Sequence, residues 1–167
     1  MILTIWRHGE AGSAATDRLR ELTDRGTEDV GFGCHQFHSM CEERGIPQPE
    51  LLLYSEWVRT TQTAEIIGLA FNHAPRKRCK ALIPGRRPED VELDLISRLQ
   101  QEPALQHVLL VSHQPLVSAL VEHLLGDYSQ VPPLMPGALA TLEMEVPAAG
   151  CATLRFSAHP PNFEAQF

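Results

Sequence analysis

The fold of this chain is decided near its start, at Ile2-Leu3-Thr4-Ile5-Trp6-Arg7-His8-Gly9-Glu10. The apolar run from Ile2 to Trp6 predicts a β-strand, and Arg7-His8 stands at the point where this strand ends. A second apolar run, Val108-Leu109-Leu110-Val111, is followed by Ser112-His113. Ligands of an open α/β sheet bind beyond the carboxyl ends of its strands, so the sequence predicts that the two histidines lie close together.

A third strand is predicted at Leu51-Leu52-Leu53-Tyr54, and it leads through Ser55 into a helix over about residues 58–71. Arg59 lies in the first turn of this helix. If the three strands are central and parallel, a phosphate at their shared edge would receive bidentate hydrogen bonds from Arg7 and Arg59. It would also lie near the backbone amides at the start of the helices that follow Ser55 and Gln114.

This arrangement predicts phosphoryl-transfer chemistry. His8 can attack phosphorus if its ring is neutral, and nearby arginines favour the neutral ring by repulsion. His113 would stabilise charge on the equatorial oxygens in the transition state. The arginines and His113 supply the positive charge that the reaction needs, so we expect no metal and no other cofactor.

The rest of the chain alternates between predicted helices and strands. Helices are predicted at about 26–44 (capped by Thr23 or Asp24), 88–101 and 115–125, a weaker strand at 78–82, and a hairpin from 138–146 and 152–157. This order predicts an α/β fold, a three-layer α/β/α sandwich with a mostly parallel central sheet and a C-terminal hairpin. No repeat or linker is visible, so we expect a single domain over residues 1–167.

The composition excludes several classes of protein. Of the 167 residues, 43% are hydrophobic and 21% are charged, which is typical of globular proteins, and the net charge of −7 argues against general nucleic-acid binding. There is no apolar run long enough to span a membrane, and the N-terminus lacks the pattern of a signal peptide. We therefore expect a cytoplasmic monomer with four free, buried thiols, at Cys34, Cys41, Cys79 and Cys151.

The residues that follow the three predicted strands together resemble the motifs of the histidine phosphatase superfamily, also called the phosphoglycerate-mutase-like family. The sequence motifs of the superfamily correspond in this chain to Arg7-His8-Gly9, to Ser55-Glu56-Trp57-Val58-Arg59-Thr60-Thr61-Gln62-Thr63, and to Val111-Ser112-His113. The resemblance implies that His8 is the phosphorylated nucleophile and that Arg7, Arg59 and His113 form the phosphate pocket. Ser55 and Arg20 are further candidates for phosphate or substrate contacts.

A finer resemblance is to the small SixA-type phosphohistidine phosphatases. It rests on Asp17-x-x-Arg20-x-Leu22-Thr23-x-x-Gly26 and on Leu82-Ile83-Pro84-Gly85. Glu21 and Glu56 stand where these phosphatases usually have proline, and Glu56 is expected to place a negative charge near the mouth of the pocket. Larger members of the family carry a glutamate after the third strand that donates a proton to the leaving alcohol. This chain has Leu82-Ile83-Pro84 at that place.

The missing acid bears on the substrate. An alkoxide needs a proton to leave, whereas a phosphorylated imidazole leaves more easily because its ring is protonated near neutral pH. The sequence therefore favours removal of phosphate from phosphohistidine on a signalling or phosphotransfer protein. A phosphatase of small phosphate monoesters on the same scaffold and a non-catalytic phosphoprotein-binding module remain as alternatives.

A few residues keep two interpretations. Glu10 is a candidate pocket acid or loop anchor, and Arg20 is a candidate phosphate contact or part of a salt bridge that holds the loop. Cys34, His38 and Cys41 share one helix face and have zinc-ligand chemistry, but apolar residues on that face favour core packing. The other histidines, including His73, show no pattern that indicates a site.

Overall fold

A six-stranded sheet forms the centre of the molecule within residues 1–71 and 74–167, which the computed structural model describes. His73 lies outside these residues. The strand order is β3-β2-β4-β1-β5-β6. The strands are β1 (Ile2–Arg7), β2 (Leu51–Tyr54), β3 (Arg76–Arg78), β4 (His107–Ser112), β5 (Leu139–Met144) and β6 (Ala152–Ala158). The first four run parallel, and β5 pairs antiparallel with both β1 and β6, so the predicted mostly parallel sheet and C-terminal hairpin are confirmed.

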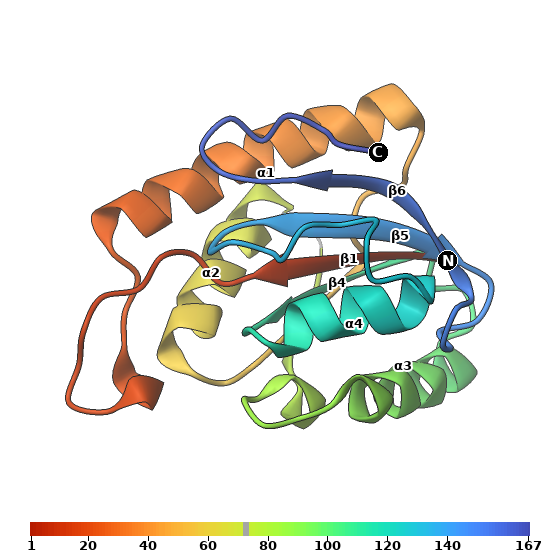
Figure 1. Ribbon diagram of the computed structural model, residues 1–167, viewed down its shortest axis with the longest axis horizontal. Helices are drawn as coiled ribbons and strands as arrows, with labels where there is room; N and C mark the ends of the chain where they lie inside the picture. Colours follow the sequence, from red (N-terminus) through yellow and green to blue (C-terminus); the bar gives the residue numbers. More distant parts are fainter. Residues whose placement is uncertain (72–73) are drawn as a thin grey trace.

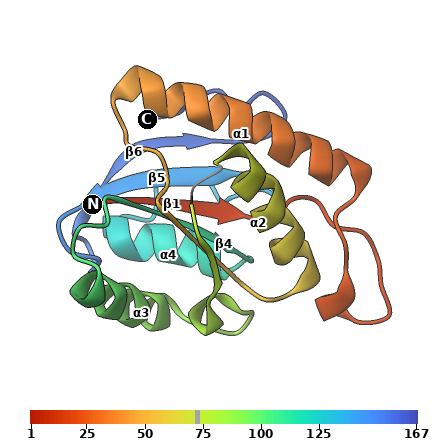
Figure 2. The ribbon, with the colours of Figure 1, turned by 180° about the vertical axis from the view of Figure 1, so that it is seen from behind.

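Helices cover both faces of the sheet (Figures 1 and 2). Helices α1 (Asp24–Arg44) and α2 (Val58–Ala70) lie on one face, and α3 (Pro88–Gln101) and α4 (Leu116–Leu125) lie on the other. Alternate residues of a strand point to opposite faces. Accordingly, Leu3 and Ile5 pack with α3 and α4, whereas Ile2 and Trp6 pack with α1 and α2. The predicted three-layer α/β/α sandwich is therefore confirmed.

Two glycines allow the segment after β1 to cross the start of α1. A Cβ atom on Gly26 would overlap the carbonyl oxygen of Glu10, and one on Gly9 would lie 2.9 Å from the carbonyl oxygen of Gly26. Thr23 caps α1 by accepting a 3.0 Å hydrogen bond from the Gly26 amide, and its own amide donates to Glu10 O over 2.9 Å. The loop between β1 and α1 is therefore held beside the carboxyl end of β1.

The third strand is shorter and earlier than predicted. It covers Arg76–Arg78 instead of 78–82, and Lys80–Leu82 forms one turn of 3-10 helix. β3 is an exposed edge strand, so no apolar residue marks it in the sequence, whereas Leu82 is buried because the turn directs it into the core. The apolar pattern that predicted a strand belongs to this turn.

The cysteines and the helices bear on two other predictions. Cys34, Cys41 and Cys79 are free and buried as predicted, but Cys151 is exposed because it lies next to the turn of the β5–β6 hairpin. Across the two described ranges, no helix is long and apolar enough to cross a membrane.

Replacing Gly26 with alanine should open the loop crossing, because the new methyl group would overlap the backbone of Glu10. We expect the free energy of unfolding to fall by about 1–3 kcal/mol, the usual cost of overpacking. Urea denaturation measures this loss. Gly31, in the same helix, is the matched control because a Cβ atom at this position would have no neighbour within 4 Å. Gly31→Ala should stabilise the protein by about 0.5–1 kcal/mol, and equal effects of the two substitutions would contradict the crossing.

Candidate active site

The three strand ends meet as the sequence predicts. Arg7 pairs with Ser112 across β1 and β4, and the His8 amide donates to Ser112 O over 3.1 Å. The Ser55 amide donates to Val111 O over 3.1 Å, which brings the end of β2 to the same place. The ring centroids of His8 and His113 are 5.3 Å apart.

His8 is buried as a neutral ring whose hydrogen bonds define its tautomer. Its Nδ1 lies 2.7 Å from Gly9 O, and its Nε2 lies 3.1 Å from Arg59 Nε. A carbonyl oxygen only accepts and a guanidinium only donates, so Nδ1 carries the hydrogen and Nε2 carries a lone pair. Burial, together with the charges of Arg59 and Arg7, lowers the pKa of His8 from 6.5 to about 4. The ring is therefore uncharged at neutral pH, and its Nε2 lone pair accepts the hydrogen bond from Arg59.

Arg59 is held in place by a residue to which the sequence analysis gave no role. Its Nη1 donates to Asp17 O over 2.7 Å, and its Nη2 lies 3.4 Å from Asp17 Oδ2. The guanidinium also lies 5.1 Å from the centroid of the Trp57 ring. Asp17 belongs to a 3-10 turn, Asp17–Leu19, in the loop over the site. It stands first in the Asp17–Gly26 motif, and this was the signal available in the sequence.

His113 is positioned by Ser55. The two side chains are both buried, and His113 Nε2 lies 2.8 Å from Ser55 Oγ. Burial, with added repulsion from His8 and Arg59, lowers the pKa of His113 to about 3. The ring is neutral, and a Ser55 hydroxyl that donates to Nε2 leaves Nδ1–H as a donor. Ser55, predicted as a phosphate or substrate contact, thus bonds to His113 in this structure.

Two buried donors of the site have no partner among the residues that the structure describes. They are Arg7 Nε and, in the tautomer in which Ser55 donates to Nε2, His113 Nδ1. Arg7 is fixed by Nη1, which donates to Leu134 O over 2.8 Å. Buried polar groups in proteins are nearly always hydrogen-bonded, so unpaired donors beside cationic side chains are suited to binding an anion.

Arg20 and Glu10 hold the loop. Arg20 donates to Gly12 O over 2.7 Å, to Ala11 O over 3.2 Å and to Asp17 Oδ1 over 3.1 Å, so all three of its guanidinium nitrogens bond within the loop. The Glu10 side chain is exposed and accepts a 2.9 Å hydrogen bond from Thr23 Oγ1. The geometry therefore favours the loop-anchor interpretation for both residues over a direct contact with phosphate.

The last two residues of the Ser55–Thr63 element fasten the same loop to α2. Gln62 Oε1 accepts from the Leu22 amide over 2.8 Å, and Thr63 Oγ1 accepts from the Gly9 amide over 3.1 Å. Both residues belong to the Ser55–Thr63 element, and their positions in the sequence alone predict no role for them. They set the distance between the loop and the helix that carries Arg59.

The carboxylates of Asp17 and Glu56 near the pocket each pair with an arginine. A hydrogen bond from Arg20 is the largest cause that lowers the pKa of Asp17, so this carboxyl stays ionised. Glu56 Oε1 pairs with Arg18 at 3.1 Å, so the negative charge that was expected at the pocket mouth is partly neutralised. Leu82 O accepts from Ser112 Oγ over 2.6 Å, which places the Leu82-Ile83-Pro84 segment, without a carboxylate, beside the end of β4.

The helix that carries Cys34, His38 and Cys41 packs into the core. The two cysteines are buried, and burial raises the pKa of each to about 12. His38 instead lies 3.7 Å from Glu42 and stacks on Phe71. Across the described part of the chain, no three His, Cys, Asp or Glu side chains gather as a metal site would require.

Comparisons with solved structures agree with this fold. The protein histidine phosphatase SixA, complexed with tungstate, is 26% identical with a TM-score of 0.79, and the match covers 96% of this chain and 97% of that chain. A putative phosphohistidine phosphatase SixA from Agrobacterium tumefaciens is 25% identical with a TM-score of 0.75, covering 95% and 97%. A mycobacterial glucosyl-3-phosphoglycerate phosphatase shares the fold at 17% identity and a TM-score of 0.68, covering 92% and 97%.

No family model matches the sequence, and no curated protein matches it. The structural neighbours nevertheless confirm the resemblance to the histidine phosphatase superfamily and, within it, to the SixA phosphatases. They support a phosphatase of the histidine-phosphatase type.

The neutral buried histidines predict acid sensitivity. The pKa values of His8 and His107 are lowered to about 4, and that of His113 to about 3, chiefly by burial. In the unfolded chain histidine titrates near pH 6.5, so between pH 6.5 and 4 the unfolded state binds more protons than the folded state. The free energy of unfolding should therefore decrease as the pH is lowered from 6.5 to 4, by up to about 1.4 kcal/mol per pH unit for each histidine.

Urea denaturation at pH 7.5, 6 and 5 measures this slope. His107 lies away from the candidate pocket and bonds to Thr4 and Pro47, so His107→Gln should remove only its own share of the slope. A free energy of unfolding that stays constant or increases as the pH is lowered from 6.5 to 5 would contradict the neutral, buried state of these rings.

Proposed function

We propose that this protein is a cytoplasmic phosphohistidine phosphatase that removes phosphate from a phosphohistidine side chain of a signalling or phosphotransfer protein. The observation that carries the proposal is the buried, neutral His8, whose Nε2 lone pair lies in a cationic pocket beside Arg7 Nε and His113 Nδ1, two buried nitrogens without a partner among the described residues. A module that only bound phosphate would not need this lone pair, and the arginines alone would provide affinity.

In the proposed mechanism, the phosphate binds between Arg7, Arg59 and His113. An oxygen of the phosphate takes the hydrogen bond that Arg59 Nε now donates to His8, which frees Nε2 to attack phosphorus. As Nε2 forms its bond to phosphorus, the bond between phosphorus and the substrate imidazole breaks, the substrate ring leaves as neutral imidazole with a proton taken from solvent, and the ring of His8 gains positive charge. The Nδ1–H bond to Gly9 O becomes charge-assisted and stabilises that form. Water then attacks phosphorus, the Nε2–phosphorus bond breaks, and inorganic phosphate and the neutral His8 ring are released.

The lack of a carboxylate in the Leu82-Ile83-Pro84 segment favours phosphohistidine over alkyl phosphates. General acid catalysis is worth about 10²–10⁴-fold in typical enzymes, and an alkoxide leaving group depends on it. The imidazole of phosphohistidine takes up a proton near neutral pH without help. Arg20 holds the Asp17 carboxyl ionised by lowering its pKa, and the bond of Glu10 to Thr23 favours a loop-anchor role for Glu10.

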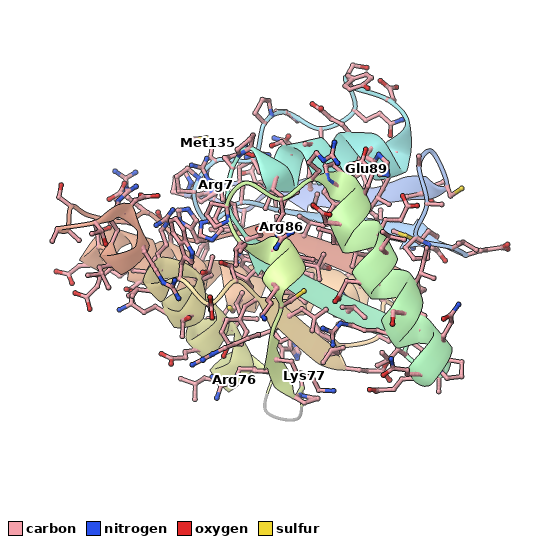
Figure 3. The ribbon with its side chains drawn as sticks, turned by 90° about the horizontal axis from the view of Figure 1, so that it is seen from below. Arg7, Arg76, Lys77, Arg86, Glu89 and Met135 are labelled. Carbon is pink, nitrogen blue, oxygen red and sulfur yellow. The ribbon has the colours of Figure 1, made fainter. Side chains whose placement is uncertain are left out.

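Exposed apolar side chains close in sequence to the residues that hold Arg59 and Arg7 favour a protein as the substrate. Leu19 is 53% exposed and lies two residues after Asp17, whose carbonyl accepts a hydrogen bond from Arg59. Met135 is 55% exposed and follows Leu134, whose carbonyl binds Arg7; the labels in Figure 3 place Met135 beside Arg7. Large apolar side chains in water beside a polar pocket are suited to contact with a second protein.

The covalent intermediate tests the mechanism. Incubation with a phosphoryl donor should leave an acid-labile, alkali-stable phosphate on the protein, and His8→Ala should lose this label. The same variant should lose turnover by about 10³-fold or more, because residues that act as one catalytic unit fail together. His35→Ala is the control, since His35 is exposed on α1, and it should keep both label and turnover. Substantial activity in His8→Ala would overturn the mechanism.

The leaving-group dependence tests the substrate class. Without a positioned acid, kcat/KM should fall steeply as the leaving-group pKa rises, so phosphohistidine peptides and activated aryl phosphates should be cleaved far faster than sugar phosphates. Measurement of kcat/KM over a series of phosphate esters gives the slope. A flat dependence would mean that another group donates the proton, and a phosphatase of small phosphate monoesters would then be the better assignment.

A further inference from the structure

Positive charge outside the pocket is concentrated in one segment. Residues 66–88 hold 6 of the 14 Lys and Arg of the chain and none of its 21 Asp and Glu, although the net charge is −7. We call these six residues the basic strip; all are exposed, and they are Arg76, Lys77, Arg78, Lys80, Arg86 and Arg87.

The charges of the basic strip are largely free. Among the described residues, Lys77 alone of the six forms an ion pair, with Glu102 at 3.6 Å and with both side chains about half exposed. By contrast, Arg18, Arg25, Arg44, Arg98 and Arg155 each lie within ion-pair distance of a carboxylate. The strip therefore presents a local excess of positive charge to solvent.

The sheet register places one end of the strip near the pocket. Arg78 pairs with Tyr54, and Tyr54 pairs with Val111, which lies two residues before His113. Neighbouring strands are about 4.8 Å apart, so the Arg78 backbone lies roughly 10 Å from the end of β4. The turn that follows β3 is fastened to β4 by Ser112 Oγ and Leu82 O. In Figure 3, Arg86 lies between Lys77 and Arg7 in projection.

The footprint of a protein substrate reaches this strip. A standard interface covers about 800 Å² on each partner, which corresponds to a disc of roughly 16 Å radius. A partner centred on the pocket would therefore also cover the carboxyl end of β3 and the Lys80–Arg86 turn. Matched charge across such an interface increases the association rate and selects partners.

We propose that the basic strip docks an acidic surface of the protein that presents the phosphohistidine, an inference that rests on the function proposed above. A protein fits better than a nucleic acid because the strip is short and acidic residues flank it, with Glu65 before it and Glu89 and Asp90 after it. Nucleic-acid binding surfaces extend their positive charge over a whole face. The pocket performs the reaction, and the strip selects the partner.

The test uses two phosphohistidine peptides, one flanked by glutamates and one flanked by serines, together with an aryl phosphate. The variant is Lys80→Gln with Arg86→Gln, since neither side chain belongs to the pocket. The control is Arg44→Gln with Arg155→Gln, which removes the same charge at the opposite end of the sheet, near Met1 and Gly45. Circular dichroism and urea denaturation check that both variants fold.

We expect the Lys80/Arg86 variant to lose about fivefold or more in kcat/KM for the glutamate peptide at low salt, and the loss should shrink at 0.5 M salt because ions screen exposed charges. Its activity on the serine peptide and on the aryl phosphate should be unchanged, as should every activity of the control variant. If the wild type cleaves both peptides and the variant shows no selective loss, docking is wrong while the proposed function stands.

A binding measurement separates the two hypotheses further. Fluorescence anisotropy with the unphosphorylated glutamate peptide should show weaker binding by the Lys80/Arg86 variant than by the wild type, whatever the outcome of the hydrolysis assay. If neither phosphohistidine peptide is cleaved, the proposed function fails, and the docking proposal fails with it as a statement about the substrate. Tighter binding of a single-stranded oligonucleotide of equal charge would reassign the strip to nucleic acid.

Discussion

The contact between Arg59 Nε and His8 Nε2 is the interaction on which the candidate site depends. A guanidinium only donates, so this 3.1 Å hydrogen bond forces the lone pair of His8 to face the cationic pocket. The buried charge must itself be held, and Asp17 holds it through its carbonyl and its carboxylate. Burial is the largest cause that lowers the pKa of His8 to about 4. A protonated ring would also lose this contact and face the positive charges of Arg59 and Arg7.

Most of the family motif serves this contact indirectly. Gly9 and Gly26 permit two backbone segments to cross where no Cβ would fit, and Thr63 and Gln62 bind the crossing loop to α2. The loop carries Asp17 and the helix carries Arg59. The distance between these two residues is therefore set by backbone crossings and amide hydrogen bonds, which are stiffer than a salt bridge between two exposed side chains.

The parts of the site that the sequence predicted are those that strand ends determine. Apolar runs locate β1, β2 and β4, and the residue after each run falls on one edge of the sheet, as it does for His8 and His113. Contacts made by loops were not predictable in this way. Ser55 bonds to His113, and Arg20 bonds to loop carbonyls. These contacts could not be predicted because the orientation of a side chain depends on χ angles, which the periodicity of the sequence does not encode. β3 was misplaced because an exposed edge strand has no apolar pattern.

Electrostatics explains how an acidic protein can act on an anionic group. A net charge of −7 repels phosphate at long range, but at physiological ionic strength screening limits that field to about 8 Å. Within this distance, the field of a local cluster of positive charges outweighs the field of the net negative charge. In the proposed function, the half-buried Arg7 and the buried Arg59 bind the phosphate, and the exposed basic strip contacts the surface around it. Because the strip lies outside the pocket, the pocket remains desolvated, which keeps His8 neutral, while the proposed docking of a partner would respond to charge outside the pocket.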